Sequence, residues 1–235
     1  MAEPRNYRRK LKGYMSSFDE ADAYIETDAY KLTSYERDGS FDYEMYKDIQ
    51  VTGNKAKLGN QWVGEDHIEI LAGKLIAVAG EKPFHGVCHG TRRGNEQAWF
   101  EAHLPPSSDV FGTEISDTAA EFPKTIQWDF HDTKDEWADR FDFIYSNSWD
   151  HTYDPKKLFH AWCACLAPGG MMLLDHGWNY QTGRVDALDA FGISEENLVS
   201  FLNTECGSWG AVTEVIDGGK HRRFPIRTIL FQRKP

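Results

Sequence analysis

The stretch FHGVCHGTRRGNEQAWF, residues 84–100, has the pattern of a strand, a glycine loop and a helix in direct succession. An apolar start leads into Gly90 and Gly94, and a polar run that ends in two aromatic residues follows. Glycines let a backbone pass close to a ligand, and the start of a helix offers free N–H groups. No Gly-Lys-Ser or Gly-Lys-Thr follows, which excludes a phosphate-binding P-loop. The stretch therefore predicts a ligand-binding loop in an α/β fold.

Strands and helices continue to alternate on the C-terminal side of this loop. Helices are expected over 95–104, 117–122, 154–170 and 194–204, and strands over 84–88, 109–115, 125–130, 141–147, 171–177, 211–217 and 224–234. Such alternation implies right-handed βαβ units and a mainly parallel sheet, and the last two strands are typical of a hairpin. We therefore predict an α/β, Rossmann-like fold with a seven-stranded, mostly parallel sheet and a C-terminal antiparallel hairpin.

The N-terminal part of the chain has a different pattern. Residues 1–60 contain many tyrosines and acidic residues with weak periodicity, so we expect helix and loop there. Residues 65–80 predict a helix that stops at Gly80. We therefore divide the chain into an N-terminal extension, 1–60, that acts as a lid or as an oligomer contact, and a second unit, 61–235.

Composition limits the possible partners and the compartment. The formal net charge is -11, which disfavours a nucleic-acid partner, because phosphate binding needs a basic face. No stretch approaches the roughly 18 apolar residues of a membrane span, and the N-terminus lacks the apolar segment of a signal peptide. The cysteines form no Cys-x-x-Cys pair, and Cys163 and Cys165 fit reduced core positions. We expect a soluble, cytoplasmic protein.

Acidic residues follow the second and third strands. Ligands of parallel sheets bind beyond the carboxyl ends of the strands. Glu114 lies 24 residues after Gly90, where an acid can accept hydrogen bonds from ribose hydroxyls. Asp129 can accept from an adenine amino group, with Trp128 or Phe130 against the ring. The plainer alternatives are an exposed or capping glutamate and a turn aspartate.

Two Asp-His dipeptides follow the next two strands. Asp150 and His151 come after the fourth strand, and Asp175 and His176 end the fifth. Adjacent parallel strands end at the same edge of a sheet, so the two dipeptides are placed to face one cleft. The sequence alone does not show which side chains reach it.

Four motifs in this order and spacing carry a family resemblance: VFGTEIS (110–116), IQWDFHD (126–132), FDFIYSNSWDHTYDP (141–155) and LAPGGMMLLDH (166–176). They resemble the post-I, II, IV and V motifs of class I S-adenosylmethionine-dependent methyltransferases, over residues 66–233. The first motif departs from the family pattern. Members usually have an acidic residue in the first strand and a glycine-rich run, whereas this chain has His85, Gly86, Cys88 and His89 there.

The resemblance implies S-adenosylmethionine as the cofactor and assigns it a set of residues. The implied cofactor-binding residues are His89, Gly90, Thr91 and Arg92 in the first loop, Glu114 and Ile115 at the ribose, Asp129 and Phe130 at the adenine, and Asn147 beside the reactive methyl group. Arg92 or Arg93 can also pair with the cofactor's carboxylate.

Methyl transfer to a hydroxyl needs alignment of the reacting atoms and usually a general base. His151 and His176 are the candidate bases, because histidine titrates near neutral pH, and Asp150 and Asp175 are orienting or alternative bases. The plainer alternative is that either histidine packs at the cleft wall. Asp150, Asp154 and Asp175 can also supply oxygen ligands to a divalent metal, which we do not favour.

The sequence segment CHGTRRGNEQ, together with GTEIS and SNSWDH, resembles methyltransferase domains associated with glycan modification. The resemblance implies O-methylation of a sugar hydroxyl, on a glycan or a small-molecule acceptor. Trp149 and Trp178 lie beside the candidate bases, where aromatic faces can stack on a sugar ring, or they are ordinary core or rim aromatics. Three alternatives stay open. They are a non-catalytic module that binds S-adenosylmethionine, an NAD-dependent oxidoreductase, which the missing Gly-x-Gly-x-x-Gly disfavours, and a metal-dependent hydrolase built on the Asp-His pairs.

Overall fold

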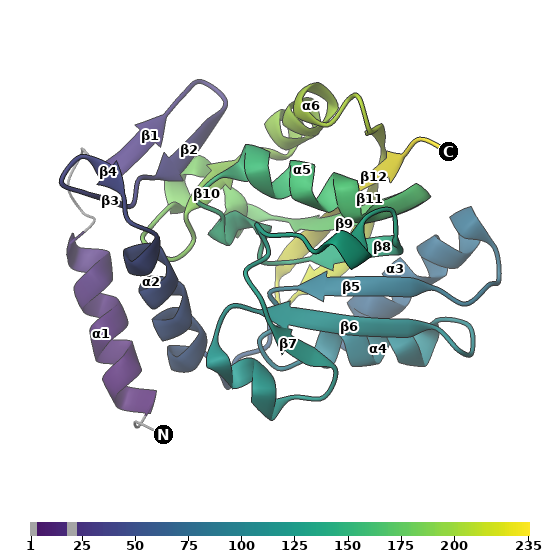
Figure 1. Ribbon diagram of the computed structural model, residues 1–235, viewed down its shortest axis with the longest axis horizontal. Helices are drawn as coiled ribbons and strands as arrows, with labels where there is room; N and C mark the ends of the chain where they lie inside the picture. The colour runs from purple at the N-terminus through teal and green to yellow at the C-terminus, as the bar shows by residue number, and fades with distance from the viewer. Residues whose placement is uncertain (1–3, 18–22) are drawn as a thin grey trace.

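The computed structural model describes residues 4–17 and 23–235, and its centre is a seven-stranded sheet (Figure 1). The strand order is β11-β12-β9-β8-β5-β6-β7. The strands are β5 (His85–His89), β6 (Asp109–Glu114), β7 (Thr125–Gln127), β8 (Phe141–Ser146), β9 (Leu166–His176), β11 (Gly210–His221) and β12 (Phe224–Arg233). Strands β5 to β9 pair in parallel, whereas β12 pairs antiparallel with both β9 and β11. The predicted fold class, with its C-terminal hairpin, is confirmed.

Helices cover both faces of this sheet. One face carries α3 (Glu65–Ala79) and α4 (Asn95–His103), and the other carries α5 (Pro155–Cys165) and α6 (Glu195–Glu205) (Figure 1). Successive side chains of a strand point to opposite faces. Val87 accordingly packs in the cluster of α5 and α6, and Cys88 in the cluster of α3 and α4. Burial of two apolar faces by two helix layers holds the carboxyl ends of the strands in place.

Some element boundaries differ from the prediction. LAPGG, residues 166–170, was predicted as the end of a helix but begins β9, because Pro168 cannot continue a helix and Leu166 pairs with Phe141. The expected strand over 125–130 is short: β7 ends at Gln127, and the Trp128 N–H makes one further bond to the Glu114 carbonyl of β6. The remaining single turns are 3-10 helices: η2 (Asp117–Glu121), η3 (Asp135–Trp137), η4 (Trp149–His151), η5 (Trp178–Tyr180) and η6 (Thr182–Arg184).

The N-terminal segment contains more regular structure than the sequence predicts. It consists of α1 (Pro4–Ser17), α2 (Tyr43–Ala56) and four short strands, β1 (Tyr24–Glu26), β2 (Tyr30–Thr33), β3 (Glu36–Arg37) and β4 (Ser40–Phe41). The side chain of Asp42 caps α2 by accepting the Met45 N–H. Strand β2 pairs with β10 (Phe191–Ile193), which lies far along the chain. Pairing between short, irregular segments so far apart in the sequence cannot be predicted from local patterns.

The N-terminal segment is also tied to the loop that precedes β10. The Tyr35 hydroxyl donates to the Ala187 carbonyl at 2.9 Å, and the Gln50 amide donates to the Leu188 carbonyl at 2.9 Å. At Gly53 an added Cβ would lie 2.3 Å from Leu188 Cδ1, so α2 packs closely on this loop. These contacts seat α2 beside the carboxyl ends of the central strands.

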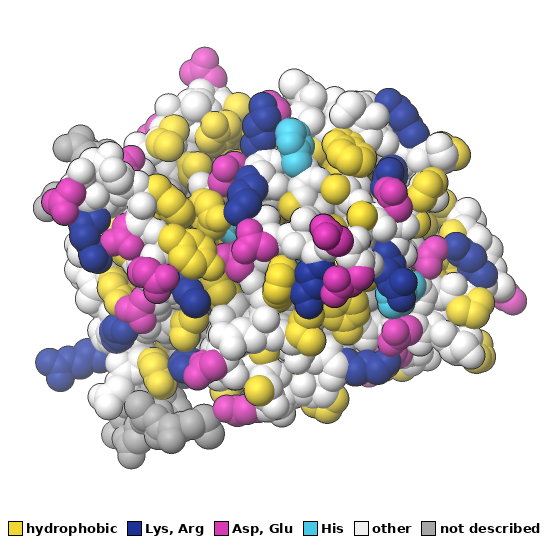
Figure 2. Space-filling model, viewed as in Figure 1, with side chains coloured by type: hydrophobic (Ala, Val, Ile, Leu, Met, Phe, Trp, Pro, Cys, Tyr) yellow, Lys and Arg dark blue, Asp and Glu magenta, His cyan; other side chains and the backbone are white. Residues whose placement is uncertain are grey.

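The molecular surface in Figure 2 has acidic and basic side chains interspersed over the viewed face rather than gathered by sign. None of the helices in the described part of the chain has the length and apolar character needed to cross a bilayer.

Candidate functional site

Two connected cavities lie at the carboxyl ends of β5, β6 and β8. The narrow cavity has a volume of about 50 Å³ and the wide cavity about 520 Å³. The narrow cavity is lined by residues of α2, β6 and the segment after β7, including Gln50, Asn54, Glu114, Ile115, Trp128 and Phe130. The wide cavity is lined mainly by polar residues, including Gln61, Thr91, Glu96, Asn147, Asp150 and Asp189. Both are lined by Lys57, Gly90, Arg92, Ser148 and His151.

The loop after β5 has a backbone that its two glycines allow. Gly90 has φ +73°, and an added Cβ would lie 2.7 Å from the Cβ of Ser148. Gly94 has φ +75° and starts α4. The N–H groups of Gly90 and Thr91 both donate to the Thr113 carbonyl, so they serve the sheet rather than a ligand. What the loop offers to a ligand is close approach at Gly90 and the side chain of Arg92.

Glu114 joins this loop to the end of β6. Its Oε2 accepts the Arg92 N–H at 3.1 Å, and its Oε1 accepts the Ser116 N–H at 3.2 Å. Burial raises the pKa of Glu114, although these N–H donors and Arg92 oppose the rise. Each carboxylate oxygen has a second lone pair, and Glu114 lines the narrow cavity together with Gly90 and Ile115. The geometry therefore suits the diol predicted for this residue.

Asp150 and His151 belong to η4, the first helical turn after β8; His151 lines both cavities and Asp150 lines the wide one. The Gln50 amide donates to the Leu188 carbonyl, which turns Gln50 Oε1 toward His151 Nδ1 at 2.7 Å. His151 Nδ1 must then donate, and in the neutral ring the lone pair is on Nε2. Burial lowers the pKa of His151 to about 4, so the ring is neutral at neutral pH.

Asp150 is the more buried member of this pair, with 3% of its surface exposed. Its Oδ1 has no hydrogen-bond partner among the described residues. Burial and the nearby charge of Asp189 raise the pKa of Asp150 well above its ordinary value. His151 Nε2 lies 3.5 Å from Asp189 Oδ1. No sequence motif points to Asp189, which belongs to an irregular loop.

Several solved structures share this architecture. A 1,6-didemethyltoxoflavin-N1-methyltransferase from Burkholderia thailandensis, with S-adenosylhomocysteine bound, superposes with a TM-score of 0.62 at 13% identity, over 90% of this chain and 99% of that one. This chain has the class I methyltransferase fold. The N-methyltransferase NodS from Bradyrhizobium japonicum WM9, also with S-adenosylhomocysteine, gives 0.55 at 14% identity over 79% and 99%. The [4+2]-cyclase SpnF gives 0.57 at 11% identity over 81% and 94%.

No protein-family model and no curated protein sequence matches the chain. Structural likeness at such identities establishes the methyltransferase fold alone, since one fold hosts many reactions. The reaction therefore depends on the side chains that line the two cavities.

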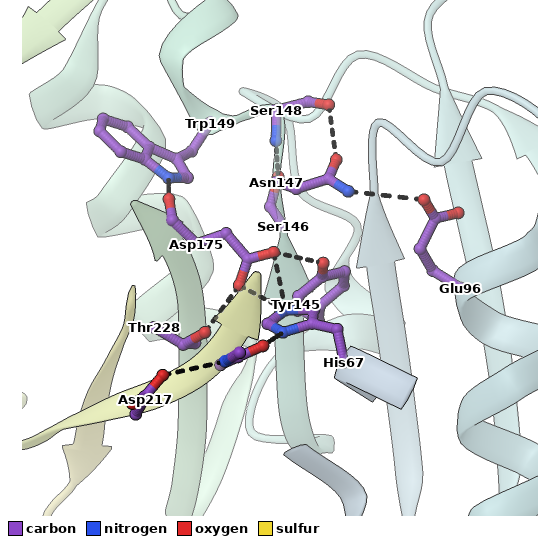
Figure 3. Close-up of polar contacts among 12 residues, drawn as sticks. His67, Glu96, Tyr145, Ser146, Asn147, Ser148, Trp149, Asp175, Asp217 and Thr228 are labelled. Atoms are coloured by element: carbon purple, nitrogen blue, oxygen red, sulfur yellow. Dashed lines mark hydrogen bonds and ion pairs between the residues drawn. The ribbon is translucent and has the colours of Figure 1, made fainter. Parts of the chain in front are cut away.

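Asp175 and His176 lie away from both cavities of this methyltransferase fold. The Asp175 carboxylate accepts from the Tyr145 hydroxyl at 2.6 Å and the Thr228 hydroxyl at 2.8 Å, and lies 2.9 Å from His67 Nε2 (Figure 3). His176 Nε2 lies 2.9 Å from the Ile193 carbonyl, and its ring is stacked near Trp149. Neither lines a cavity, so only one of the two Asp-His pairs reaches the site, and Asp175 and His176 have structural surroundings.

Asp129 also points elsewhere. The Tyr43 hydroxyl donates to its Oδ2 at 2.8 Å, and His131 Nδ1 lies 2.7 Å from its Oδ1. Burial opposes ionisation, but the contacts with His131 outweigh it and keep the pKa of Asp129 below its ordinary value. Asp129 does not line the narrow cavity, whereas its neighbours Trp128 and Phe130 do. The structure thus provides the predicted aromatic wall without a free carboxylate beside it.

His89 is a core residue. Its ring is stacked on Trp162 with centroids 4.7 Å apart, and Nδ1 lies 2.7 Å from the Thr113 hydroxyl. Burial lowers the pKa of His89 to about 3. His89 lines neither cavity, unlike its loop neighbours Gly90, Thr91 and Arg92.

The low pKa of His89 predicts acid sensitivity. The pKa of His89 in the folded protein lies below its value of about 6.5 in the unfolded chain. The neutral, buried ring therefore contributes stability that is fully present above pH 6.5 and is lost as pH falls toward 3. Each such histidine contributes a slope of about 1.4 kcal/mol per pH unit. In urea unfolding between pH 4.5 and 6.5, the slope of unfolding free energy against pH should be smaller for His89→Gln than for wild type by about one proton. Equal slopes for wild type and His89→Gln would contradict the assignment.

Glu96 is a cavity residue that the sequence pattern did not single out. It is 4% exposed, and Gln61 Nε2 donates to its Oε1 at 2.8 Å. The Asn147 amide approaches the same oxygen at 3.5 Å (Figure 3), and Oε2 has no partner among the described residues. Burial raises the pKa of Glu96. An acid in the first turn of a helix usually interacts with the helix dipole. The position of Glu96 after Gly94 therefore does not by itself indicate a binding residue.

Proposed function

We propose that this protein transfers a methyl group from S-adenosylmethionine to a hydroxyl of a sugar, on a glycan or a small molecule. The observation that carries the proposal is the buried Glu114 in a narrow cavity with an aromatic wall, joined to a wide polar cavity at Gly90. The solved methyltransferases that share the fold, with S-adenosylhomocysteine bound, support the same cofactor. A Cβ at Gly90 would lie 2.7 Å from the Cβ of Ser148, so only glycine leaves room for the backbone at this shared wall of the two cavities.

The cavity residues fit the parts of this cofactor in turn. Glu114 would accept hydrogen bonds from the ribose, and Ile115, Trp128 and Phe130 would enclose the adenine. The free Oε2 of Glu96 would accept the ammonium group of the methionine moiety, and Arg92 would pair with its carboxylate. Glu96 thereby takes the place of the acid that the first strand lacks.

His151 is the residue that we propose as general base. S-adenosylmethionine supplies an electrophilic methyl group: a C–O bond forms, the C–S bond breaks, and sulfur keeps the electron pair. His151 lines both cavities and has its Nε2 lone pair on the side of Asp189, at the wall of the wide cavity, so it can take the proton of a hydroxyl bound there. Asp150, the residue before His151 on η4, supplies a carboxyl group beside this base.

The wide cavity supports a sugar acceptor. Trp62 and Trp178 line it, and sugars pack against aromatic faces. The rest of the lining consists of amide, histidine and charged side chains that can bond hydroxyls. We keep the cytoplasm as the proposed location, because all four cysteines are free and buried. We also keep the lid role for the N-terminal segment, since α2 lines the narrow cavity.

The first test is cofactor binding. Calorimetry with S-adenosylmethionine, S-adenosylhomocysteine and NAD is expected to show binding of the first two. Glu114→Ala should weaken it at least tenfold, because it removes hydrogen bonds to a charged acceptor. Glu121→Ala, an exposed acid downstream, is the control. No binding of either sulfur compound would refute the proposal, and NAD binding in their place would favour an oxidoreductase. Binding without turnover of any acceptor would favour a non-catalytic module.

Glu96→Gln tests the ammonium contact separately. We expect the affinity for S-adenosylhomocysteine to fall about 10- to 100-fold, since a hydrogen bond to a charged group is lost. The affinity for 5′-methylthioadenosine, which lacks the amino-acid part, should not change. Glu69→Gln, an exposed residue of α3, serves as the control. Equal loss for both ligands would mean that Glu96 supports the cavity wall instead.

A further inference from the structure

We propose that Asp150, His151 and Asp189 form a binding site for a divalent cation at the wall of the wide cavity. One ligand atom from each residue lies within 4.8 Å of the other two. Two ligands on opposite sides of a cation with bonds of about 2.1–2.4 Å are about 4.2–4.8 Å apart. The three side chains are therefore as far apart as ligands of one ion, without movement of the backbone.

Asp150 is the residue that most needs a partner. It is 3% exposed, and its Oδ1 has no hydrogen-bond partner among the described residues. A buried carboxylate without a partner is costly, and buried acids in proteins are usually paired or bound to metal. Asp150 lines the wide cavity, so a small cation can reach it. The same wall includes Asp189, a second carboxylate, which lies 3.9 Å from Lys57 Nζ.

His151 is oriented as metal-binding histidines are. The chain of hydrogen bonds from the Leu188 carbonyl through Gln50 to Nδ1 fixes the ring and leaves the lone pair on Nε2. That nitrogen lies 3.5 Å from Asp189 Oδ1, where two electron-rich atoms face each other without a proton between them. A cation bound to both atoms removes this repulsion. A second residue that holds the other ring nitrogen is the usual support of a histidine ligand.

Asp189 is held in place by its own loop. Asp186 Oδ1 accepts the N–H groups of Leu188 and Asp189 at 2.7 and 2.9 Å, which fixes the turn that presents Asp189. Lys57 Nζ is 3.9 Å from Asp189 Oδ1 and is the cation that a metal ion has to displace. Two carboxylates and one imidazole suit a divalent transition-metal ion such as Mn²⁺ better than Mg²⁺, which prefers oxygen ligands, with the remaining positions left to water or to an acceptor.

The site differs from the one that the sequence suggested. Asp154 caps α5 by accepting the Lys157 N–H, and Asp175 is in the core network, so only Asp150 is common to both sets. Cation binding does not depend on the proposed function. If both hold, the cation would take the Nε2 lone pair and lower the pKa of an acceptor hydroxyl bound to it, whose proton would leave to water, and His151 acts as base only in the cation-free protein.

Manganese titration of the full chain, without cofactor or acceptor, tests the site. Calorimetry and the electron paramagnetic resonance signal of free Mn²⁺ should show one saturable site per chain. Asp150→Asn and Asp189→Asn should each weaken it at least tenfold, and Asp154→Asn, which keeps a capping side chain, should not. Asp189 is a third exposed, so Asp189→Asn is expected to fold even if Asp150→Asn does not. Circular dichroism shows whether each of these two variants is folded.

A second measurement identifies the histidine. Mn²⁺ should broaden the ¹⁵N signals of His151 beyond detection, with His103 as an unaffected reference. No saturable Mn²⁺ binding, or equal binding by wild type and Asp189→Asn, would overturn the proposal. Mn²⁺ binding with no affinity for S-adenosylmethionine would keep the site and refute the methyltransferase. Binding of S-adenosylmethionine without binding of Mn²⁺ would refute the cation site and keep His151 as the proposed base.

Discussion

Replacing His151 by asparagine is expected to lower kcat for methyl transfer about 10²- to 10⁴-fold, the range that a positioned proton acceptor supplies. Asparagine can still bond to Gln50 but has no basic nitrogen. The affinity for S-adenosylhomocysteine should be retained, because the proposed contacts to its ribose and amino-acid parts come from Glu114 and Glu96. The measurement is formation of S-adenosylhomocysteine with the acceptor selected by a sugar and glycan screen, in the presence of EDTA.

Two matched variants make this result specific. His176→Asn removes the other histidine that the sequence proposes as base, and we expect its kcat to stay within a few-fold of wild type wherever it is folded, because its Nε2 faces the Ile193 carbonyl. His103→Asn, at the end of α4, controls for histidine loss as such. A large loss in His176→Asn with wild-type activity in His151→Asn would exchange the two assignments.

Replacing Asp175 by alanine is expected to destabilise the fold by about 3–5 kcal/mol, because the change removes the shared partner of a buried ionic and hydrogen-bonded group. His67, Tyr145 and Thr228 would all lose their contact with the carboxylate (Figure 3). For a chain of this size the melting temperature should fall by about 10 °C or more. Calorimetric or urea unfolding gives the value, with Asp28→Ala, an exposed acid, as control.

The pH dependence of this loss is a further check. Burial opposes protonation of His67, but the charge and hydrogen bond of Asp175 outweigh it and raise the pKa of His67. A raised pKa adds stability that is complete below the unfolded value of about 6.5 and is lost as pH rises through the folded value. The difference between wild type and Asp175→Ala should therefore be largest below pH 6.5. A difference that grows with rising pH would refute a charged His67–Asp175 pair.

The order of strands and the acid after β6 were predictable because they depend on local patterns. Alternation of apolar residues fixes strands, and the spacing from Gly90 to Glu114 follows from the length of one βα unit. The hairpin at the C-terminus has turn residues and two β-rich runs that identify it. These features need no knowledge of how distant segments meet.

The rest of the site depends on distant contacts. Asp129 and Glu114 both follow strands, yet Tyr43, 86 residues earlier, bonds to Asp129. Asp150 and Asp175 both precede a histidine, but the side chain of Asp175 points to His67 on α3 instead of to the cavity. Asp189 lies in a loop with no periodicity. No local pattern states which face a side chain takes at a strand end or what will cover it.

The helix that lines the narrow cavity is made early and finds its partners late. Tyr35 and Gln50 bond to carbonyls 152 and 138 residues further on, and β2 pairs with β10. During synthesis, the N-terminal segment therefore leaves the ribosome long before the loop that seats it exists. Contacts of such long sequence separation form slowly and leave apolar surface exposed meanwhile. The wall of the narrow cavity is thus the part of this protein whose completion depends most on a nascent chain staying soluble until the loop before β10 has been translated.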